Sequence, residues 1–564
     1  MNKKYLLLIP CHVVLLTVLL WFEGCAILAP EDAYYEYKVP DKKLHTITPI
    51  EPNQFTAPKP APAKEQTPDA KAETKTEPNL PPPPEMQMSL EQCRVTTLQN
   101  NLELQAQLIA PAIAAASVGA EEAKFEAAFY ANTSLSTTDA PGTAGKLDNG
   151  TYYPGYGASQ YRNINSSAGV QMPLRTGGTL DFSLADERTH SLGDGPQFDN
   201  SFTFSVSQPL LKNAGQRVNM HSIRLARYEK QITDNTTKLE VIRVLAAADR
   251  AYWQLYAARK ELEVRKEQHK LATAQLERAK RMVNAGQMAN IEIVRAGAGV
   301  ARQLAAIITA ENNLRTSQRK FKRVINKPGL DIETPTIMIP TTEADPVHYT
   351  FDTPKLIDQA FENRAELLEL ELRIAEDVSK IDYLNNQMLP LVTMDYTYNV
   401  TGTGSTRNDS YDMLNKKNYE NHRVGVSLWV PLGNEAAKNN LRQAMYVKRQ
   451  RLATKASQHQ LVKQEVLDAL DQAEANWQQI MASRQDALLE GELYNAEVRQ
   501  FEVGLRTSTD VLDIQTKLAD AQSAEITALV NYEISLVDMA YATGTLLGAD
   551  KVQWQATTPI VPVK

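Results

Sequence analysis

The stretch "FTFSVSQPLLKNAGQRVN" occupies residues 202–219, and "VGVSLWVPLGNEAAKNN" occupies residues 424–440. In both, an alternation of apolar and polar residues meets Pro-Leu, passes a Gly and opens a long helical pattern. The alternation predicts a strand with one apolar and one polar face. Pro209 and Pro431 cannot donate to a strand ladder and have a φ suited to a helix start. We therefore predict two strand-to-helix corners in one chain.

The two corners belong to a tandem repeat, in which each unit reads helix, strand, polar loop, strand, long helix, Gly break and helix. Equivalent positions are 263, 222 and 218 residues apart for the pairs Asn100/Asn363, Pro209/Pro431 and Gly286/Gly504. The helical parts of the two units therefore agree closely in length. The extra residues of the first unit fall in its polar loop, from Asp139 to about Gly178, where insertions disturb no packing.

Each unit contains a very long helix, the first predicted from Gly215 to about Ala285. A helix of about 70 residues is about 105 Å long at 1.5 Å per residue. Its apolar side chains recur every three or four residues, so we expect coiled packing against other helices. Gly286 and Gly504 interrupt the patterns, and we expect them to form the turns at the tips of two helical hairpins.

Four strands of about ten residues are predicted per chain, which is the length of a tilted strand that crosses a bilayer. Apolar runs after the N-terminus are too short for a membrane helix, so a membrane span has to use strands. Four strands cannot close a barrel alone, and open edges are costly in lipid. Two chains would give eight strands and three would give twelve. We predict a mostly α protomer that contributes four strands to a trimeric 12-stranded barrel, continued by a helical coiled-coil tunnel.

The N-terminus reads as an export signal, because Lys3 and Lys4 precede an apolar stretch that ends in "WFEGC". Gly24 and Cys25 fit a lipoprotein signal in which Cys25 is lipidated. The alternatives are an ordinary signal cleaved nearby and an uncleaved anchor. We predict six segments along the chain, which are a signal (1–24), a proline-rich linker (25–88), a first repeat (89–330), a crossing linker (331–350), a second repeat (351–548) and a tail (549–564).

The composition argues against several classes of protein. The net charge is −7, which does not suit a nucleic-acid binder. There are three cysteines, and no disulfide framework follows from Cys25 and Cys93. His-Glu-x-x-His, Cys-x-x-Cys and Walker patterns are missing from the sequence, so we expect no catalytic residue, no metal and no cofactor.

From about Ser89 to Gly548 the chain resembles the TolC-like outer-membrane efflux family. The resemblance rests on the repeat, on "SVSQPLL" and "VSLWVPLG", and above all on "FEVGLRTSTDVLDIQTKLADAQ" from Phe501. It implies a homotrimer with a twelve-stranded barrel in the outer membrane and a helical tunnel across the periplasm. It also implies a periplasmic adaptor protein and an inner-membrane pump as partners at the lower end.

The resemblance further implies roles for residues at the tips. Arg506 matches the family's gating arginine, and Glu292 stands where the family has its carboxylate partner. Asp510 and Asp513 match acidic residues that ring the entrance, and carboxylate rings favour cations. Alternatively, these are ordinary solvated residues, and Asp510 caps the following helix. Phe501 lacks the hydroxyl that some members use in the gate.

The function expected from these features is an outer-membrane exit duct that exports small toxic compounds. One alternative is a duct for type I protein secretion. An alternative of another class is a lipid-anchored coiled-coil spacer of the envelope that never forms a pore.

Overall fold

The computed structural model describes residues 84–140, 145–146, 152–153, 159–191, 195–550 and 552. The chain divides into two units, Met1–Pro81 and Pro82–Lys564, and the described residues all belong to the second. The expected signal, the lipidation site Cys25 and most of the linker and tail therefore lie outside the described residues.

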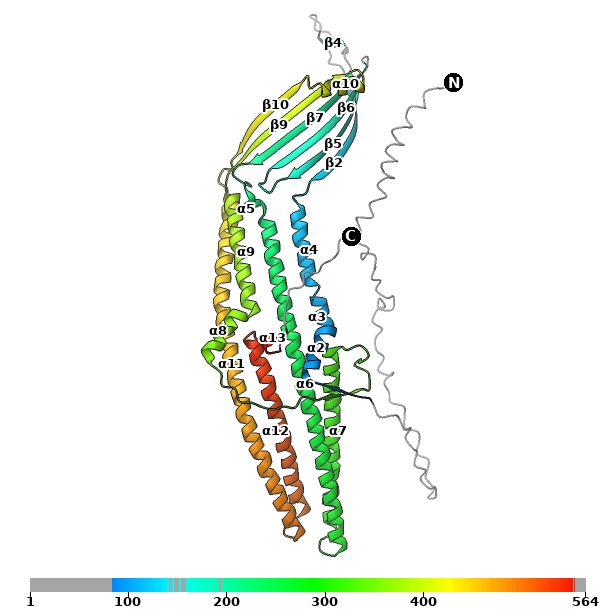
Figure 1. The fold of residues 1–564 in the computed structure, drawn as a ribbon, viewed down its shortest axis with the longest axis vertical. Coiled ribbons are helices and arrows are strands. Elements are labelled where there is room, and N and C mark those ends of the chain that lie inside the picture. Colours follow the sequence, from blue (N-terminus) through cyan, green and yellow to red (C-terminus); the bar gives the residue numbers. More distant parts are fainter. Residues whose placement is uncertain are drawn as a thin grey trace, which may run out of the picture. The chain divides into compact units, whose positions relative to one another are not determined.

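Two long helical hairpins form the framework of the second unit (Figure 1). The first consists of α6 (His221–Asn284) and α7 (Ile291–Ile325), and the second of α11 (Glu435–Glu502) and α12 (Ser508–Ala542). The long arms have 64 and 68 residues, so each is about 100 Å long at 1.5 Å per residue. The short arms have 35 residues each. This arrangement confirms the two predicted helix–break–helix units.

Shorter helices flank the hairpins and follow the same repeat. In the first repeat α4 packs on α6. In the second repeat α9 packs on both α6 and α11, and α8 packs on α11. Their bounds are α2 (Leu90–Asn100), α3 (Leu102–Gln107), α4 (Ala110–Ala123), α5 (Gln216–Asn219), α8 (Thr353–Asn363), α9 (Ala365–Gln387), α10 (Arg407–Asn415) and α13 (Leu546–Ala549).

The main apolar core lies in the middle of the hairpins, where α2, α6, α7 and α12 meet. Tyr252, Phe321 and Val530 are buried together there. Cys93 is a free cysteine in the same core, and its burial raises the pKa of the thiol to about 12. Cys93 therefore acts as a packing residue of this core.

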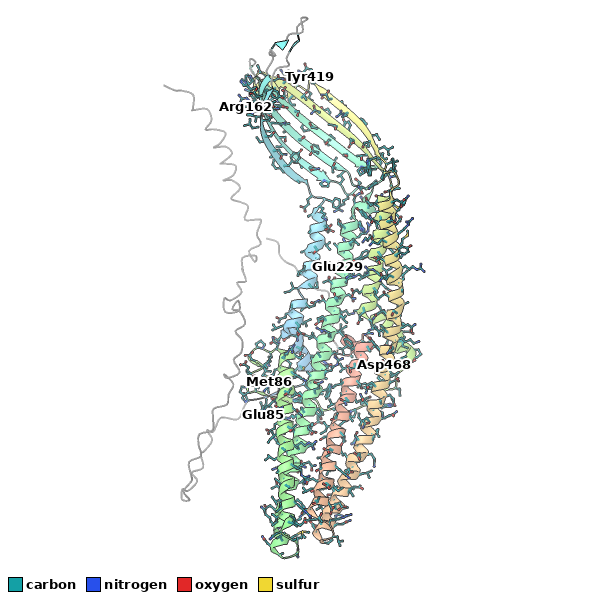
Figure 2. The ribbon with its side chains drawn as sticks, turned by 180° about the vertical axis from the view of Figure 1, so that it is seen from behind. Glu85, Met86, Arg162, Glu229, Tyr419 and Asp468 are labelled. Carbon is teal, nitrogen blue, oxygen red and sulfur yellow. The ribbon has the colours of Figure 1, made fainter. Side chains whose placement is uncertain are left out.

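A small parallel ladder closes this core on one side. β1 (Glu85–Met88) pairs with β8 (Ile337–Pro340), and Figure 2 labels Glu85 and Met86 beside the hairpins. The Tyr252 hydroxyl donates to the Met88 carbonyl at 3.2 Å and accepts from the Thr342 amide at 2.9 Å. Residues 85–88, which we assigned to the linker, are thus ordered, because a buried tyrosine and a second strand satisfy their backbone.

The sheet at one end of the unit has six strands in the order β10-β9-β7-β6-β5-β2, and every neighbouring pair is antiparallel. The strands of this sheet are β2 (Ala128–Ala140), β5 (Ser159–Pro173), β6 (Thr179–Ser191), β7 (Pro196–Pro209), β9 (Leu391–Gly404) and β10 (Glu420–Trp429). A separate two-residue pair joins β3 (Gly145–Lys146) to β4 (Tyr152–Tyr153). The prediction of four strands per chain was wrong, since the first repeat supplies four and the second supplies two.

One strand, β5, comes from the segment that we assigned to a polar loop, whereas β2 lies almost entirely before that segment. β5 occupies residues 159–173, inside the predicted loop, and pairs along its whole length with β2 and β6. Its alternation is hard to see in the sequence because small residues such as Ser166 and Ala168 occupy apolar-face positions. The insertion therefore extends the sheet.

The two proline corners end strands but do not begin helices. Pro209 is the last residue of β7, and Pro431 follows the end of β10. The helices begin only at Gln216 and Glu435. The chain reverses through residues with positive φ, which are Asn213 and Gly215 in the first corner and Gly433 and Asn434 in the second. The role that we predicted for the prolines in starting the helices was therefore wrong, because intervening turn residues set the helix direction.

Two helical stretches are long and apolar enough, by length and composition alone, to cross a membrane. They are Leu102–Ala123 and Ile291–Ile325, and only 11% and 22% of their apolar windows are buried in the single chain. The expectation that the apolar runs are too short for such a helix was wrong by this measure. Both stretches also pack along α6 as parts of the helical bundle.

Candidate functional site: the hairpin tips and the sheet

Both hairpin tips turn through the same glycine geometry. Gly286 and Gly504 have φ of 73° and 77°, a left-handed conformation that glycine adopts without strain. At the first tip the Gly286 amide donates to Val283 and the Gln287 amide donates to Met282, each at 2.9 Å. The second tip repeats both hydrogen bonds. This is the Schellman arrangement that ends a helix at glycine, and it confirms both predicted tip turns.

An apolar cluster beneath the turns holds the two hairpins together. Ala279 and Ala296 of the first hairpin pack with Phe501 and Val511 of the second, and all four are buried. The Phe501 ring, for which we noted the missing hydroxyl, is fully buried in this cluster. Phe501 therefore serves packing at the tip.

The second tip begins its outgoing helix with a capping box. The Thr507 hydroxyl accepts from the Asp510 amide at 3.4 Å, and the Asp510 carboxylate accepts from the Thr507 amide at 2.9 Å. Hydrogen bonds from the backbone and side chain of Thr507 lower the pKa of Asp510, so it stays ionised. The capping role that we kept as an alternative for Asp510 is therefore present.

The first tip lacks this cap, since Ala289 stands at the position equivalent to Thr507. Glu292, the equivalent of Asp510, reaches the second hairpin instead and accepts from the Ser508 amide at 2.8 Å. It also pairs with Arg295 at 2.6 Å. Burial raises the pKa of Glu292, but the hydrogen bonds from Ser508 and the Arg295 guanidinium outweigh it, so the pKa lies below its usual value.

Arg506 does not pair with Glu292 within one chain, contrary to the suggested link. Its guanidinium Nε lies 3.0 Å from a Glu497 carboxylate oxygen and 3.1 Å from the Gln500 side-chain oxygen. Both partners are in the last turns of α11, so the side chain folds back over its own hairpin. The reason is local, because Glu292 is already occupied by Ser508 and Arg295.

Glu497 is the tip residue that the sequence reasoning missed. It is nearly buried, with 8% of its surface exposed, and a buried carboxylate needs a partner. A Schellman turn brings the residues after Gly504 back beside the last turns of α11. In the sequence, Glu497 precedes the turn glycine Gly504 and Arg506 follows it. This order was the signal from which the ion pair could have been predicted.

Asp513 lies on the exposed side of α12 at the same tip. The tip also carries an ion pair between the hairpins, from Arg278 to Glu502 at 3.3 Å. Among the described residues, no group of three or more metal-ligating side chains is found. The tip is thus a surface of carboxylates and arginines above an apolar cluster.

The opposite end of the unit presents a sheet with two chemically distinct faces. Side chains that are directly paired share a face. One row joins Phe129, Val170, Phe182, Phe204 and Tyr398 across five strands. Phe129 is 72% exposed in the single chain. A row on the other face reads Tyr130, Gly169, Ser183, Thr203, Asn399 and Asn421. An exposed apolar face backed by a polar face is the pattern of a membrane barrel.

Such a sheet joined to helical hairpins about 100 Å long defines a subunit of an envelope channel. The family model described as "Outer membrane efflux protein" matches residues 179–327 and 356–545. Because the match covers more than half of the chain, the protein belongs to the outer membrane efflux protein family. This family comprises transport ducts of the outer membrane, not enzymes.

Individual relatives agree with this assignment. Outer membrane protein TolC of Vibrio cholerae is 26% identical over 306 residues, which are 53% of this chain and 67% of the relative. Outer membrane protein TolC of Escherichia coli is 24% identical over 360 residues, or 62% and 70% of the two chains. The Campylobacter jejuni CmeC outer membrane channel has a similar fold, with a TM-score of 0.59 at 14% identity over 81% of this chain and 86% of that one.

Proposed function

We propose that three copies of this chain form the outer-membrane exit duct of a tripartite efflux system that exports small toxic compounds. The observation that carries the proposal is the sheet, whose apolar face is exposed and whose outer strands, β2 and β10, have no further strand beside them among the described residues. In lipid, each unpaired backbone group costs several kcal/mol, so the sheet is complete only with other copies.

The long hairpins suit the periplasmic half of the duct. Several large apolar side chains are exposed on α7 and α11 of the single chain, and neighbouring copies would cover them. They are Ile291, Val294, Leu304 and Ile308 on α7, and Met445, Tyr446, Met481 and Leu488 on α11. A periplasmic adaptor and an inner-membrane pump would dock near the tips, and the pump would supply the energy.

Planar-bilayer recording tests the duct directly. Purified protein should give stable single-channel conductance, and deletion of the gene should raise the accumulation of dyes and drugs in the cell. A spacer protein would give no conductance. Loss of one secreted protein with unchanged drug sensitivity would instead point to type I secretion.

The gate at the entrance rests on Arg506. Its ion pair with Glu497 would hold the guanidinium at the tip, where three copies would face one another. Arg506→Ser should raise the single-channel conductance, and Glu497→Gln should reproduce most of that increase because it frees the same guanidinium. Arg499→Ser is the matched control, since Arg499 is an exposed arginine of the same helix end. Equal conductance in all variants would show that Arg506 does not gate the entrance.

The acidic ring is the second part of the entrance. Asp510 and Asp513 of three copies would give six carboxylates, which favour cations. Asp513→Asn is the cleaner test, because Asp510 also caps α12. We expect Asp513→Asn to lower the cation-to-anion permeability ratio measured from reversal potentials. An unchanged ratio would make Asp513 an ordinary solvated residue.

A lipid on Cys25 would anchor each chain to the membrane. The support is the signal-like sequence that ends at this cysteine. Labelling with a fatty-acid analogue should mark the mature protein and fail to mark Cys25→Ser. A label that survives this substitution would argue against lipidation at Cys25.

A further inference from the structure

The first repeat adds β2 and β5 to the sheet, and their side chains continue both of its faces. β5 places Ile164, Val170 and Met172 on the apolar face, in rows with Arg188, Phe182 and Leu180 of β6. β2 adds Phe129 and Leu135 to the same face. On the polar face β2 carries Asn132, Ser134 and Ser136. A surface loop has no reason to keep this period of two in register with its neighbours.

A three-strand contact on the polar face fastens β2 and β5 to β6. The Tyr130 ring lies over Gly169, where an added Cβ would stand 2.6 Å from the ring. The Tyr130 hydroxyl then donates to Asp181 of β6 at 3.0 Å. Aromatic cover of a strand glycine by a neighbouring strand is a known way to fix register. Asn163 of β5 also donates to Glu187 of β6.

The two outer strands have the polarity that closure requires. The six strands alternate in direction, so β2 and β10, at opposite edges, are antiparallel to each other. β2 leaves the helical end of the sheet and β10 returns to it, as Figure 1 shows. Arg162 and Tyr419, labelled in Figure 2, lie at the far end. Rotation of one copy into the next therefore brings β10 beside β2 in an antiparallel pair.

We propose that β2 of each copy pairs with β10 of the next, so that the trimer closes an 18-stranded barrel instead of a 12-stranded one. The proposal rests on the trimeric duct proposed above. Strands about 4.8 Å apart and tilted by about 40° give a backbone diameter near 36 Å for eighteen strands and near 24 Å for twelve. Barrels of 16–18 strands enclose an aqueous channel. The exit would thus be of porin width, and selection of cargo would be left to the narrower tips.

The alternative closure uses only β6, β7, β9 and β10, with the β2–β5 hairpin outside the barrel. It requires β6 to exchange its partner, because β5 pairs with β6 over 13 positions from Tyr161 to Pro173. It would also separate Tyr130 from Asp181. The two closures predict different neighbours for β10, and this difference can be measured.

Cysteine cross-linking in the full-length protein distinguishes the two closures. Ser427→Cys on the polar face of β10 is combined in one chain with Asn132→Cys, Ser134→Cys or Ser136→Cys on β2. The scan is needed because one chain does not define the register between copies. The matched control combines Ser427→Cys with Ser183→Cys on the polar face of β6. Cys93 is buried and stays in place.

We expect one of the β2 combinations to give covalent species up to a trimer on denaturing gels, and the β6 combination to give almost none. A cross-link to β6 would overturn the proposal in favour of twelve strands. Covalent species that stop at a dimer would overturn it in favour of a two-chain barrel. Conductance without either cross-link would overturn it while leaving the duct intact. Failure to conduct at all would remove the duct itself and this barrel with it.

Discussion

The two repeats of the chain agree in the lengths of several helices and differ at both ends. Their short arms have 35 residues each, and α2 and α8 have 11 residues each. Yet the first repeat supplies four strands to the six-stranded sheet and the second supplies two. At the tips, one repeat has a capping box and the other has a carboxylate that reaches its neighbour.

The difference follows from what each region must contact. α12 packs against α6 and α7, and α6 and α11 both pack against α9, so a residue gained in one helix would shift every later contact. A sheet edge tolerates a whole hairpin, because two strands preserve both the alternation of direction and the period of side chains. A tip needs only hydrogen-bond acceptors for the free N–H groups at the start of its outgoing helix. These acceptors can come from the same tip or from the other hairpin.

The largest expected effect concerns the asymmetric tip core. Phe501 is fully buried, while its counterpart in the first repeat, Val283, is only half-buried. Phe501→Ala should lower the stability of the tip by about 3–5 kcal/mol through lost burial and a cavity. Val283→Ala should cost much less. Thermal unfolding followed by circular dichroism, together with protease cleavage at the tips, measures the loss of stability in each variant. Equal losses would show that the two tip cores are equivalent.

The glycine turns at the two hairpin tips have the same geometry, so substitutions in them should have equal effects on stability. Gly286→Ala and Gly504→Ala each place a side chain at positive φ and should cost about 1–2 kcal/mol. Gly297→Ala is the matched control, because this glycine lies inside α7 with open space at its Cβ. It should stabilise by about 0.5–1 kcal/mol. Chemical or thermal denaturation of the three variants checks the order.

The caps should respond differently in the two tips. Thr507→Ala removes the capping box of α12 and should cost about 1 kcal/mol. Ala289→Thr should offer the first tip an equivalent cap and draw Glu292 away from Ser508. Hydrogen exchange at the Ser508 amide reports this change, and we expect faster exchange in Ala289→Thr. Unaltered exchange would mean that the bond between the hairpins outcompetes a local cap.

A further expected effect is a pH dependence of stability at Glu533 of the second repeat. Burial, helped by nearby Asp345, raises the pKa of Glu533 to about 7, while its counterpart in the first repeat is the exposed Arg315. The folded protein binds this proton more tightly than the unfolded chain does. The contribution of Glu533 to stability is therefore fully present below about pH 4.5 and is lost as the pH rises through 7.

The melting temperature should therefore fall between pH 5 and pH 8, and Glu533→Gln should remove part of that slope. Asp550, whose pKa burial raises to about 6, accounts for a further part. Glu492→Gln, at an exposed carboxylate, should leave the slope as it is. If the melting temperature of Glu533→Gln depends on pH as that of the parent does, the group responsible for this dependence is not Glu533.

The helical architecture could be predicted from the sequence because its signals are long and repeated. Apolar spacing over sixty or more residues and a glycine at each break leave little choice of structure, and Gly286 and Gly504 lie where predicted. β5 could not be predicted in the same way. Its strand signal depends on a few side chains such as Ile164 and Val170, and polar pairing with β2 and β6 does the rest.

The candidate site was predicted in part for a related reason. The tip residues were located correctly, but their partners depend on competition between nearby groups. Glu292 is engaged by Ser508 and Arg295, so Arg506 turns to Glu497. Only the folded tip shows which donor reaches which carboxylate. Sequence spacing gives the set of candidates but not the pairs.

The hydrogen bond from the Ser508 amide to Glu292 has a mechanical consequence. It fastens the start of one outgoing helix to the start of the other at the hairpin tips. A dilation that swings the second hairpin alone must break this bond in every subunit. In the trimeric duct proposed above, a dilation that keeps this bond must rotate both hairpins of a subunit together, so that the aperture would widen in three pieces and not in six.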